Sequence, residues 1–349
     1  MAAETPQSPP TTFREANLGA TAIRDLKLTI EGTRLEPVVA EFVRELDAAG
    51  ITKLRPRFYL STEWGVAFNT VAIGIPFYLA RPDLTAIHVE RHGHIEGFGP
   101  VDILRYLRHE MGHVINYGYK LYDEAEWVNL FGSITQPYVE EYRPAPFSRR
   151  YVRHLPGWYA QKHPDEDWSE TFAVWMTPGG AWREEYKDKP AALAKLSYCD
   201  RTMERLKDKD PLVTVTEPDE EVGQIPYSVD QFYRQQQLTT EFPLGLDGAL
   251  RAIFEDLGAP DESSTKTIVA RKPASQLIRR VERTLMANIY RWTGHFPERT
   301  RALLRHLADR ADNLDLRYPE DREIPAVVGI TTLVTALAMN HVHRGNYLP

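Results

Sequence analysis

The hydrophobic positions of the chain recur with a helical period in some segments and form β-rich runs in others. Over residues 36–49 apolar side chains recur at helical spacing and Gly50 is a suitable end, so we expect a helix there. The segments 56–64, 71–80 and 84–90 are rich in β-branched and aromatic residues, which are typical of strands. The N-terminal half is therefore expected to contain a small sheet.

Two further segments carry the start and stop signals of long helices. One begins at Pro100, whose ring suits the first helical position, and Gly118 is a suitable end. The other begins at Pro164, has three acidic residues in its first turn, where the helix dipole favours negative charge, and stops before the Pro-Gly-Gly at 178–180. Both helices carry polar residues among apolar ones, so they are the first candidates for a functional site.

The composition of the chain changes after Leu212. Residues 213–226 are acidic and loop-like, and the segments beyond them show helical periodicity. We therefore predict an α+β domain over 13–212, an acidic linker over 213–226 and a mainly α-helical C-terminal domain over 227–349. Residues 1–12 are rich in Pro, Ser and Thr and are predicted to form a disordered tail.

Composition narrows the class of protein. A hydrophobic fraction of 42% is typical of a folded globular chain, and a net charge of −7 argues against a general nucleic-acid binder. The one cysteine, Cys199, excludes an intrachain disulfide and suits a reducing compartment. No signal peptide is visible, and the apolar run 324–339 is interrupted by Pro325 and Gly329, so we expect a buried helix there. These features predict a cytoplasmic protein that binds neither nucleic acid nor membrane.

The segment His-Glu-Met-Gly-His on the first long helix predicts a zinc site. Side chains four residues apart lie on one face of a helix, so His109 and His113 can reach one metal ion. Glu110 is rotated away from the metal but stays near a water molecule that the metal activates, which is the position of a general base. The neighbouring residues are mostly apolar, and buried histidines need polar partners or a metal.

A catalytic zinc ion needs a third protein ligand. The metzincin pattern requires Gly and His where this chain has Asn116 and Tyr119, and an aminopeptidase-like spacing would put a glutamate near Gly132. Peptide deformylases use an upstream cysteine, whereas Cys199 lies far downstream. The remaining source is a glutamate on the second long helix.

That helix offers Glu166 and Glu170 as the third ligand. Glu166 lies in the first turn, where the helix dipole alone explains a carboxylate. Glu170 lies mid-helix among Trp168, Phe172 and Trp175, where a carboxylate is costly unless it meets a cation or a donor. We therefore favour Glu170 over Glu166 as the ligand and expect an acid one turn earlier to orient a histidine.

Residues from about 20 to 212 resemble the bacterial zinc-binding metallopeptidase family. The likeness rests on the segments 107–122 and 142–178 and, upstream, on 61–65 and 74–80. More distantly, the Glu-Thr-Phe-Ala at 170–173 is similar to the segment that supplies the third zinc ligand in gluzincins. The resemblance implies a zincin-like metallopeptidase domain that holds one Zn²⁺ per chain, with the ligands His109, His113 and Glu170.

The expected reaction is zinc-assisted hydrolysis of a peptide bond, with Glu110 as the general base. The resemblance implies a tyrosine seven residues before the third ligand that stabilises the transition state. This chain has His163 at that position and Tyr159 four residues earlier, so both are candidates for stabilising the oxyanion. The alternatives are an amidase or isopeptidase that acts on a modified peptide, and a catalytically idle zinc-binding interaction module.

Three arginines precede the second long helix in a stretch without acidic residues. Guanidinium groups bind carboxylates in a bidentate way, so Arg149, Arg150 and Arg153 are candidates for binding an acidic group of a peptide-like substrate. The alternative, slightly favoured, is that they form structural ion pairs with the glutamates at 140–141 or with the acids at 165–167.

Overall fold

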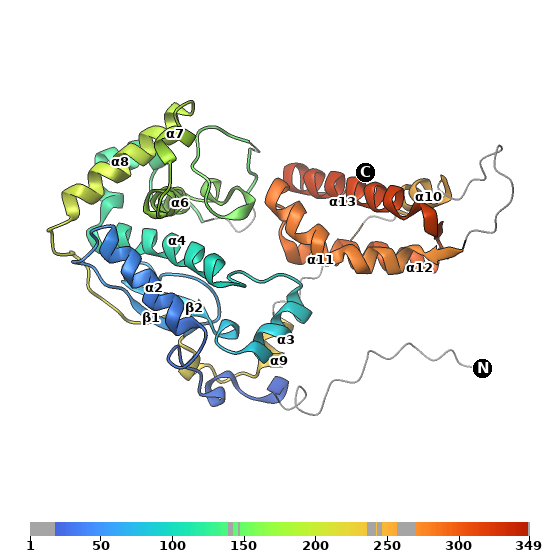
Figure 1. Cartoon of the computed structure of the whole chain (residues 1–349), viewed down its shortest axis with the longest axis horizontal. Coiled ribbons are helices and arrows are strands. Elements are labelled where there is room, and N and C mark those ends of the chain that lie inside the picture. Colours follow the sequence, from blue (N-terminus) through green and yellow to red (C-terminus); the bar gives the residue numbers. More distant parts are fainter. Residues whose placement is uncertain are drawn as a thin grey trace.

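The computed structural model describes residues 18–138, 142–145, 147–235, 242, 246–256 and 270–347, so the predicted tail at 1–12 lies outside the described residues. The described chain is mainly helical with two short sheets and belongs broadly to the α+β class (Figure 1). The strands are β1 (Arg57–Ser61), β2 (Ala72–Pro76), β3 (Arg271–Pro273) and β4 (Arg317–Pro319). The α-helices are α2 (Leu35–Ala48), α3 (Pro82–His92), α4 (Pro100–Tyr119), α5 (Ala125–Phe131), α6 (Pro164–Met176), α7 (Trp182–Glu185), α8 (Pro190–Leu206), α9 (Val229–Gln235), α10 (Leu246–Asp256), α11 (Ala274–Thr293), α12 (Pro297–Asn313) and α13 (Glu323–Arg344). Short 3-10 helices are η1 (Ile23–Leu26), η2 (Phe77–Leu79), η3 (Leu121–Asp123), η4 (Pro156–Gln161), η5 (Val222–Gln224) and η6 (Glu320–Arg322).

Helix α4 is the central element of the first half of the molecule. Strands β1 and β2 pair in parallel, with Arg57 opposite Ala72. They lie with α2 on one side of α4, whereas α6 lies on the other side (Figure 1). Every residue of α4 from His109 to Tyr119 is buried, so the polar side chains in this stretch must find their partners inside the protein.

Most predicted elements of this half are confirmed. The helix predicted over 36–49 is α2, and those predicted to begin at Pro100 and Pro164 are α4 and α6. Strands β1 and β2 lie within the predicted strands at 56–64 and 71–80. The start signals of the two central helices and the stop signal of α6 are therefore informative, because caps and prolines act locally.

Two local predictions are wrong. Residues 84–90 are not a strand but part of α3, which has Pro82 in its first turn and ends at Gly93 with a φ of 73°. These terminal signals outweigh the β-branched content of the segment. Gly118 does not end α4 either, because the helix continues to Tyr119 and the left-handed residue that follows is Lys120.

Buried apolar side chains form two main clusters. The first runs through residues from Ile23 to Tyr233 and the second through residues from Leu246 to Tyr347, which include the predicted C-terminal helices α10 to α13. Residues 222–233, which the sequence pattern assigns to the linker and the helical domain, pack in the first cluster. A hydrogen bond from the Ile23 amide to the Tyr227 carbonyl holds this segment in place.

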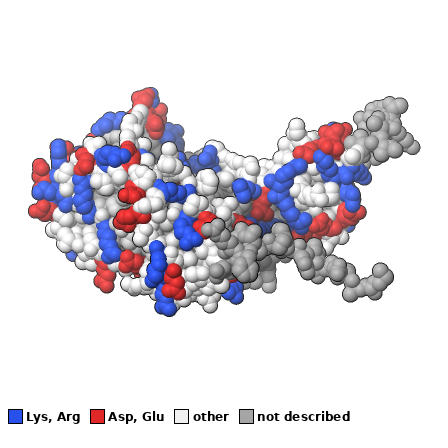
Figure 2. Space-filling view, turned by 60° about the horizontal axis from the view of Figure 1, so that its bottom comes forward, with Lys and Arg blue, Asp and Glu red and all other residues white. Residues whose placement is uncertain are grey.

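The last helix, α13, is buried on one side. Ala326, Ile330 and Val334 pack in the second cluster, whereas Ile324 and Val328 are exposed. The segment Glu320–Arg344 is long and apolar enough to cross a membrane by length and composition, and 28% of its apolar window is buried. On the face that Figure 2 shows, positive and negative side chains are interspersed over both halves of the molecule.

Two arginines link the N-terminal and C-terminal halves of the molecule at helix ends. Arg301 of α12 donates hydrogen bonds to the backbone carbonyls of Glu90 and Arg91 at the end of α3. Arg153 donates in the same way to the carbonyl of Arg291 at the end of α11. The last carbonyls of a helix have no partner within it, and a guanidinium group satisfies both their hydrogen bonding and their negative partial charge.

Candidate metal centre

Helices α4 and α6 approach closely because Gly112 places no side chain between them. A Cβ atom at Gly112 would lie 2.6 Å from the Cα atom of Ser169, which is closer than packed atoms can come. The indole Nε1 of Trp168 donates a hydrogen bond of 2.7 Å to the Gly112 carbonyl. The glycine inside the His-Glu-Met-Gly-His segment therefore helps to determine which residues of α6 face the two histidines.

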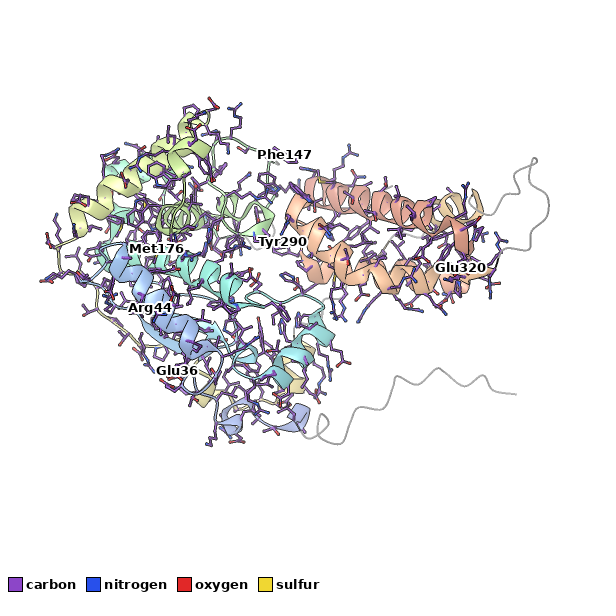
Figure 3. The ribbon with its side chains drawn as sticks, viewed as in Figure 1. Glu36, Arg44, Phe147, Met176, Tyr290 and Glu320 are labelled. Carbon is purple, nitrogen blue, oxygen red and sulfur yellow. The ribbon has the colours of Figure 1, made fainter. Side chains whose placement is uncertain are left out.

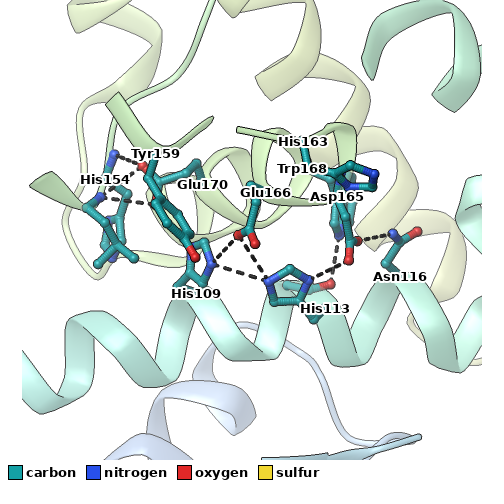
Figure 4. Close-up of polar contacts among 12 residues, drawn as sticks. His109, His113, Asn116, His154, Tyr159, His163, Asp165, Glu166, Trp168 and Glu170 are labelled. Carbon is teal, nitrogen blue, oxygen red and sulfur yellow. Dashed lines mark hydrogen bonds and ion pairs between the residues drawn. The ribbon is translucent and has the colours of Figure 1, made fainter. Parts of the chain in front are cut away.

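Three atoms that can bind a metal come together between these helices (Figure 4). Nε2 of His109 lies 2.9 Å from Oε2 of Glu166 and 3.3 Å from Nε2 of His113, and the last two atoms are 3.4 Å apart. Ligand atoms about 2.0–2.1 Å from a tetrahedral zinc ion are about 3.3–3.4 Å from one another. The triangle therefore fits a zinc ion after only a small movement of Glu166, and all three side chains are buried.

Glu170, the predicted third ligand, is not part of this group, in which Glu166 supplies the carboxylate. The Glu170 carboxylate lies behind His109 and accepts a hydrogen bond of 3.0 Å from Nδ1 of that ring. It also accepts hydrogen bonds from the backbone amides of His154, at 2.7 Å, and Leu155, at 2.9 Å. The buried Glu170 does meet donors, as its sequence context predicts, and these are an imidazole and two backbone amides.

Each histidine is oriented by a carboxylate on α6. Glu170 holds Nδ1 of His109, and Asp165 holds Nδ1 of His113 at 2.9 Å. When Nδ1 donates its proton to a carboxylate, the lone pair of Nε2 is free to bind a metal. Asp165 also accepts hydrogen bonds from Asn116 and Tyr117, which fix its position in turn.

Without a metal ion, the histidines of the centre hold protons that a bound metal ion would displace. Burial alone would lower the pKa of His109, but hydrogen bonds to Glu166 and Glu170 outweigh it and raise this pKa to about 9. Despite its burial, Glu166 has a pKa well below its ordinary value because of the charge and hydrogen bonds of His113 and His109. Metal ligation requires neutral imidazoles and an ionised carboxylate, so metal binding would release the histidine protons.

His109, His113 and Glu166 line a pocket of about 660 Å³ together with Glu110. Glu110, the predicted general base, is buried, and burial raises the pKa of its carboxyl group. The pocket also has walls from the C-terminal half, namely Tyr290 and Phe296. In Figure 3 Tyr290 lies where the two halves of the molecule meet.

Tyr159, one of the two predicted oxyanion-stabilising residues, lies beside the metal-binding group. Its ring centroid is 5.6 Å from that of His109, and its hydroxyl group is 3.4 Å from the hydroxyl group of Tyr138. Burial raises the pKa of Tyr159 well above its ordinary value, so the hydroxyl group stays protonated and can donate a hydrogen bond. This residue lines the pocket, so it remains a candidate for donating a hydrogen bond to an oxyanion there.

His163, the other candidate, also lines the pocket, but both of its ring nitrogens have partners. Nδ1 accepts a hydrogen bond of 3.2 Å from the backbone amide of Asp165, which makes His163 the N-cap of α6. Nε2 lies 3.0 Å from the carbonyl oxygen of Gln136. The ring is therefore held as a capping residue, and its proton points at a backbone carbonyl rather than at a substrate.

The three arginines predicted to bind substrate do not line this pocket. Arg149 and Arg153 line a second pocket of about 280 Å³. Arg149 donates to the carbonyl of Asp188, and Arg153 stacks over Trp158, with 4.2 Å from its guanidinium carbon to the ring. Arg150 is exposed, and the glutamates considered as its partners, at 140–141, lie outside the described residues.

Sequence reasoning missed two residues of the centre. Tyr138 donates a hydrogen bond of 2.6 Å to Oε1 of Glu166 from a loop that carries no recognisable signal. Asp165 was explained by the helix dipole alone, although a signal existed. Asn116 and Tyr117 follow His113 by three and four residues, so they share its helix face and present donors to a carboxylate.

Comparison with known proteins adds no relative. No family model matches the chain, and neither does any curated protein or solved structure.

Proposed function

We propose that the chain is a zinc-dependent metallopeptidase with a zincin-like fold that hydrolyses an amide bond of a peptide or peptide-like substrate, akin to the bacterial zinc-binding metallopeptidases it resembles. The observation that carries the proposal is the triangle of His109, His113 and Glu166, with edges of 2.9, 3.3 and 3.4 Å. The acid Glu110 lies in the same pocket. Three protein ligands leave a fourth position for water, as in catalytic zinc sites.

A zinc ion held by these three residues would lower the pKa of a water molecule toward neutrality and polarise the scissile carbonyl group. Glu110 accepts the proton of the attacking water and passes it to the leaving amine. Burial supports this second transfer, because a carboxyl group with a raised pKa holds the proton until the amine takes it. The hydroxyl group of Tyr159 donates a hydrogen bond to the oxyanion that develops on the substrate.

The proposal is tested by comparing the wild-type protein with Glu110→Gln. Zinc content is measured by mass spectrometry, and hydrolysis is followed on a peptide library that includes isopeptide-linked members, which separates a peptidase from an isopeptidase. We expect about one zinc ion per chain in both proteins and hydrolysis at least about 100-fold slower in the variant.

Three results would contradict the proposed mechanism. One is full activity of Glu110→Gln, and another is unchanged activity of the wild-type protein after zinc has been removed. The third is stoichiometric zinc binding by a wild-type protein that cleaves no member of the library, which would favour the zinc-binding interaction module instead.

A further inference from the structure

The pocket beside the metal-binding group contains a carboxylate that the proposed mechanism does not use. Glu96 lies in the turn before α4 and lines the pocket together with Trp64 and Tyr106. Trp64 donates a hydrogen bond of 3.3 Å to the backbone carbonyl of Glu96, which ties the ring to this turn. Among the described residues, no lysine or arginine forms an ion pair with the Glu96 carboxylate.

Aromatic rings form the walls around this carboxylate. Trp64 and Tyr106 are stacked, with ring centroids 5.4 Å apart and planes 13° apart. Tyr290 and Phe296 line the same pocket from the C-terminal half, with centroids 6.2 Å apart. Aromatic faces attract cations through their quadrupole, most strongly where water is excluded. A carboxylate among such rings suits a positively charged group with an apolar stem.

The charged side chains that line the pocket favour the same kind of group. Among the described residues that line it, the acids Glu63, Glu96, Glu110, Asp165 and Glu166 outnumber the lysine, Lys162. Burial, followed by the negative charge of Glu298, raises the pKa of Glu96 to about 7. A cation bound beside Glu96 would offset the excess of acidic groups and would lower the pKa of Glu96 again.

We propose that this pocket binds a lysine or arginine side chain of the substrate and that Glu96 pairs with its charge. This inference rests on the proposed peptidase function and names its substrate class. It replaces the acidic substrate that the arginines suggested, because Arg149 and Arg153 lie in a separate pocket. The flat aromatic walls accept the aliphatic stem of the side chain, while the carboxylate sets its charge preference.

The test measures binding and cleavage separately. Three blocked pentapeptides of alanine carry lysine, glutamine or glutamate at the centre, so that no terminal charge contributes. Their dissociation constants are measured by calorimetry with the zinc-loaded full-length Glu110→Gln protein, which prevents turnover. We expect the lysine peptide to bind about tenfold more tightly than the glutamine peptide, or about 1.4 kcal/mol, and the glutamate peptide to bind most weakly.

The role of Glu96 is tested by adding Glu96→Gln to this protein, with the exposed Glu31→Gln as the matched control. The preference for lysine should fall to within about twofold in the first variant and persist in the control, because only the first removes the paired charge. Equal binding of the three peptides, a preference for glutamate, binding of none of them, or a lysine preference that survives Glu96→Gln would each overturn the inference.

Cleavage by the wild-type protein then distinguishes the two proposals. A lysine preference in binding without any cleavage refutes the peptidase function but leaves the cation-binding pocket intact. Cleavage of the three peptides at equal kcat/KM would support the peptidase function and refute the preference for a cationic side chain.

Discussion

Replacing Glu166 and Glu170 separately by glutamine should reveal two different roles for two glutamates one helical turn apart. Among the described residues, the partners of Glu166 are all side chains, namely those of His109, His113 and Tyr138. Glu170 instead accepts hydrogen bonds from one histidine and from two backbone amides. We expect Glu166→Gln to act mainly on metal affinity and Glu170→Gln to act on metal affinity and on the folding of the metal-free protein.

The expected magnitudes follow from these contacts. Structural zinc sites bind with about 10–16 kcal/mol shared over four ligands, so losing the Glu166 ligand should cost about 2.5–4 kcal/mol, or roughly 70- to 900-fold in affinity. Losing a residue that orients a ligand costs about 10- to 100-fold, which is the expectation for Glu170→Gln. The side-chain amide that Glu170→Gln introduces would also leave a buried backbone donor without an acceptor, which should destabilise the metal-free protein by about 1–3 kcal/mol.

Zinc affinity is measured by competition with a chelating indicator, and the free energy of unfolding by urea titration in EDTA. Glu204→Gln on the exposed face of α8 is the matched control, and we expect both quantities to be unchanged in it. If Glu170→Gln lost more zinc affinity than Glu166→Gln, then Glu170 would be the ligand and the arrangement described for α6 would be wrong.

Three further predictions address the surroundings of the centre. Gly112→Ala should destabilise the protein by about 1–3 kcal/mol in urea unfolding, because its Cβ atom would meet the backbone of α6 at 2.6 Å. Gly118→Ala is the control and should be nearly neutral, because its Cβ atom meets only the end of a flexible leucine side chain. In EDTA the folded protein should lose stability as the pH rises from about 6.5 to 9, since the pKa of His109 is about 9 when folded against an ordinary 6.5; a flat urea midpoint across this range would contradict this. Tyr159→Phe should lower kcat about 100-fold with zinc content unchanged, whereas His163→Asn, which keeps the N-cap, should retain activity; the reverse outcome would exchange their roles.

The parts of the fold that could be predicted from the sequence are those that local signals determine. Pro100 and Pro164 mark the starts of the two helices of the centre, and the four-residue spacing of His109 and His113 places both rings on one face. The strand predicted over 84–90 failed because β-branched residues are only a weak indicator, and the helix signals at its ends were stronger. The wall that the C-terminal half contributes to the pocket depends on long-range packing, which no local pattern encodes.

The positions of Glu166 and Glu170 show why the carboxylate that joins the two histidines could not be identified from local burial. Both carboxylates are buried, so the cost of burial applies to both, and the helix dipole at Glu166 does not exclude a second role. The point at which α6 crosses α4 determines which of the two glutamates lies beside the Nε2 atoms of the histidines. Gly112 and Ser169 set that point through a backbone contact, and it brings Glu166 toward the tips of the histidine rings and Glu170 behind one of them. A glycine between two histidines of such a motif thus indicates close packing against a second helix. The carboxylate that joins the histidines is then expected on that second helix, about one turn from the residue that the glycine contacts.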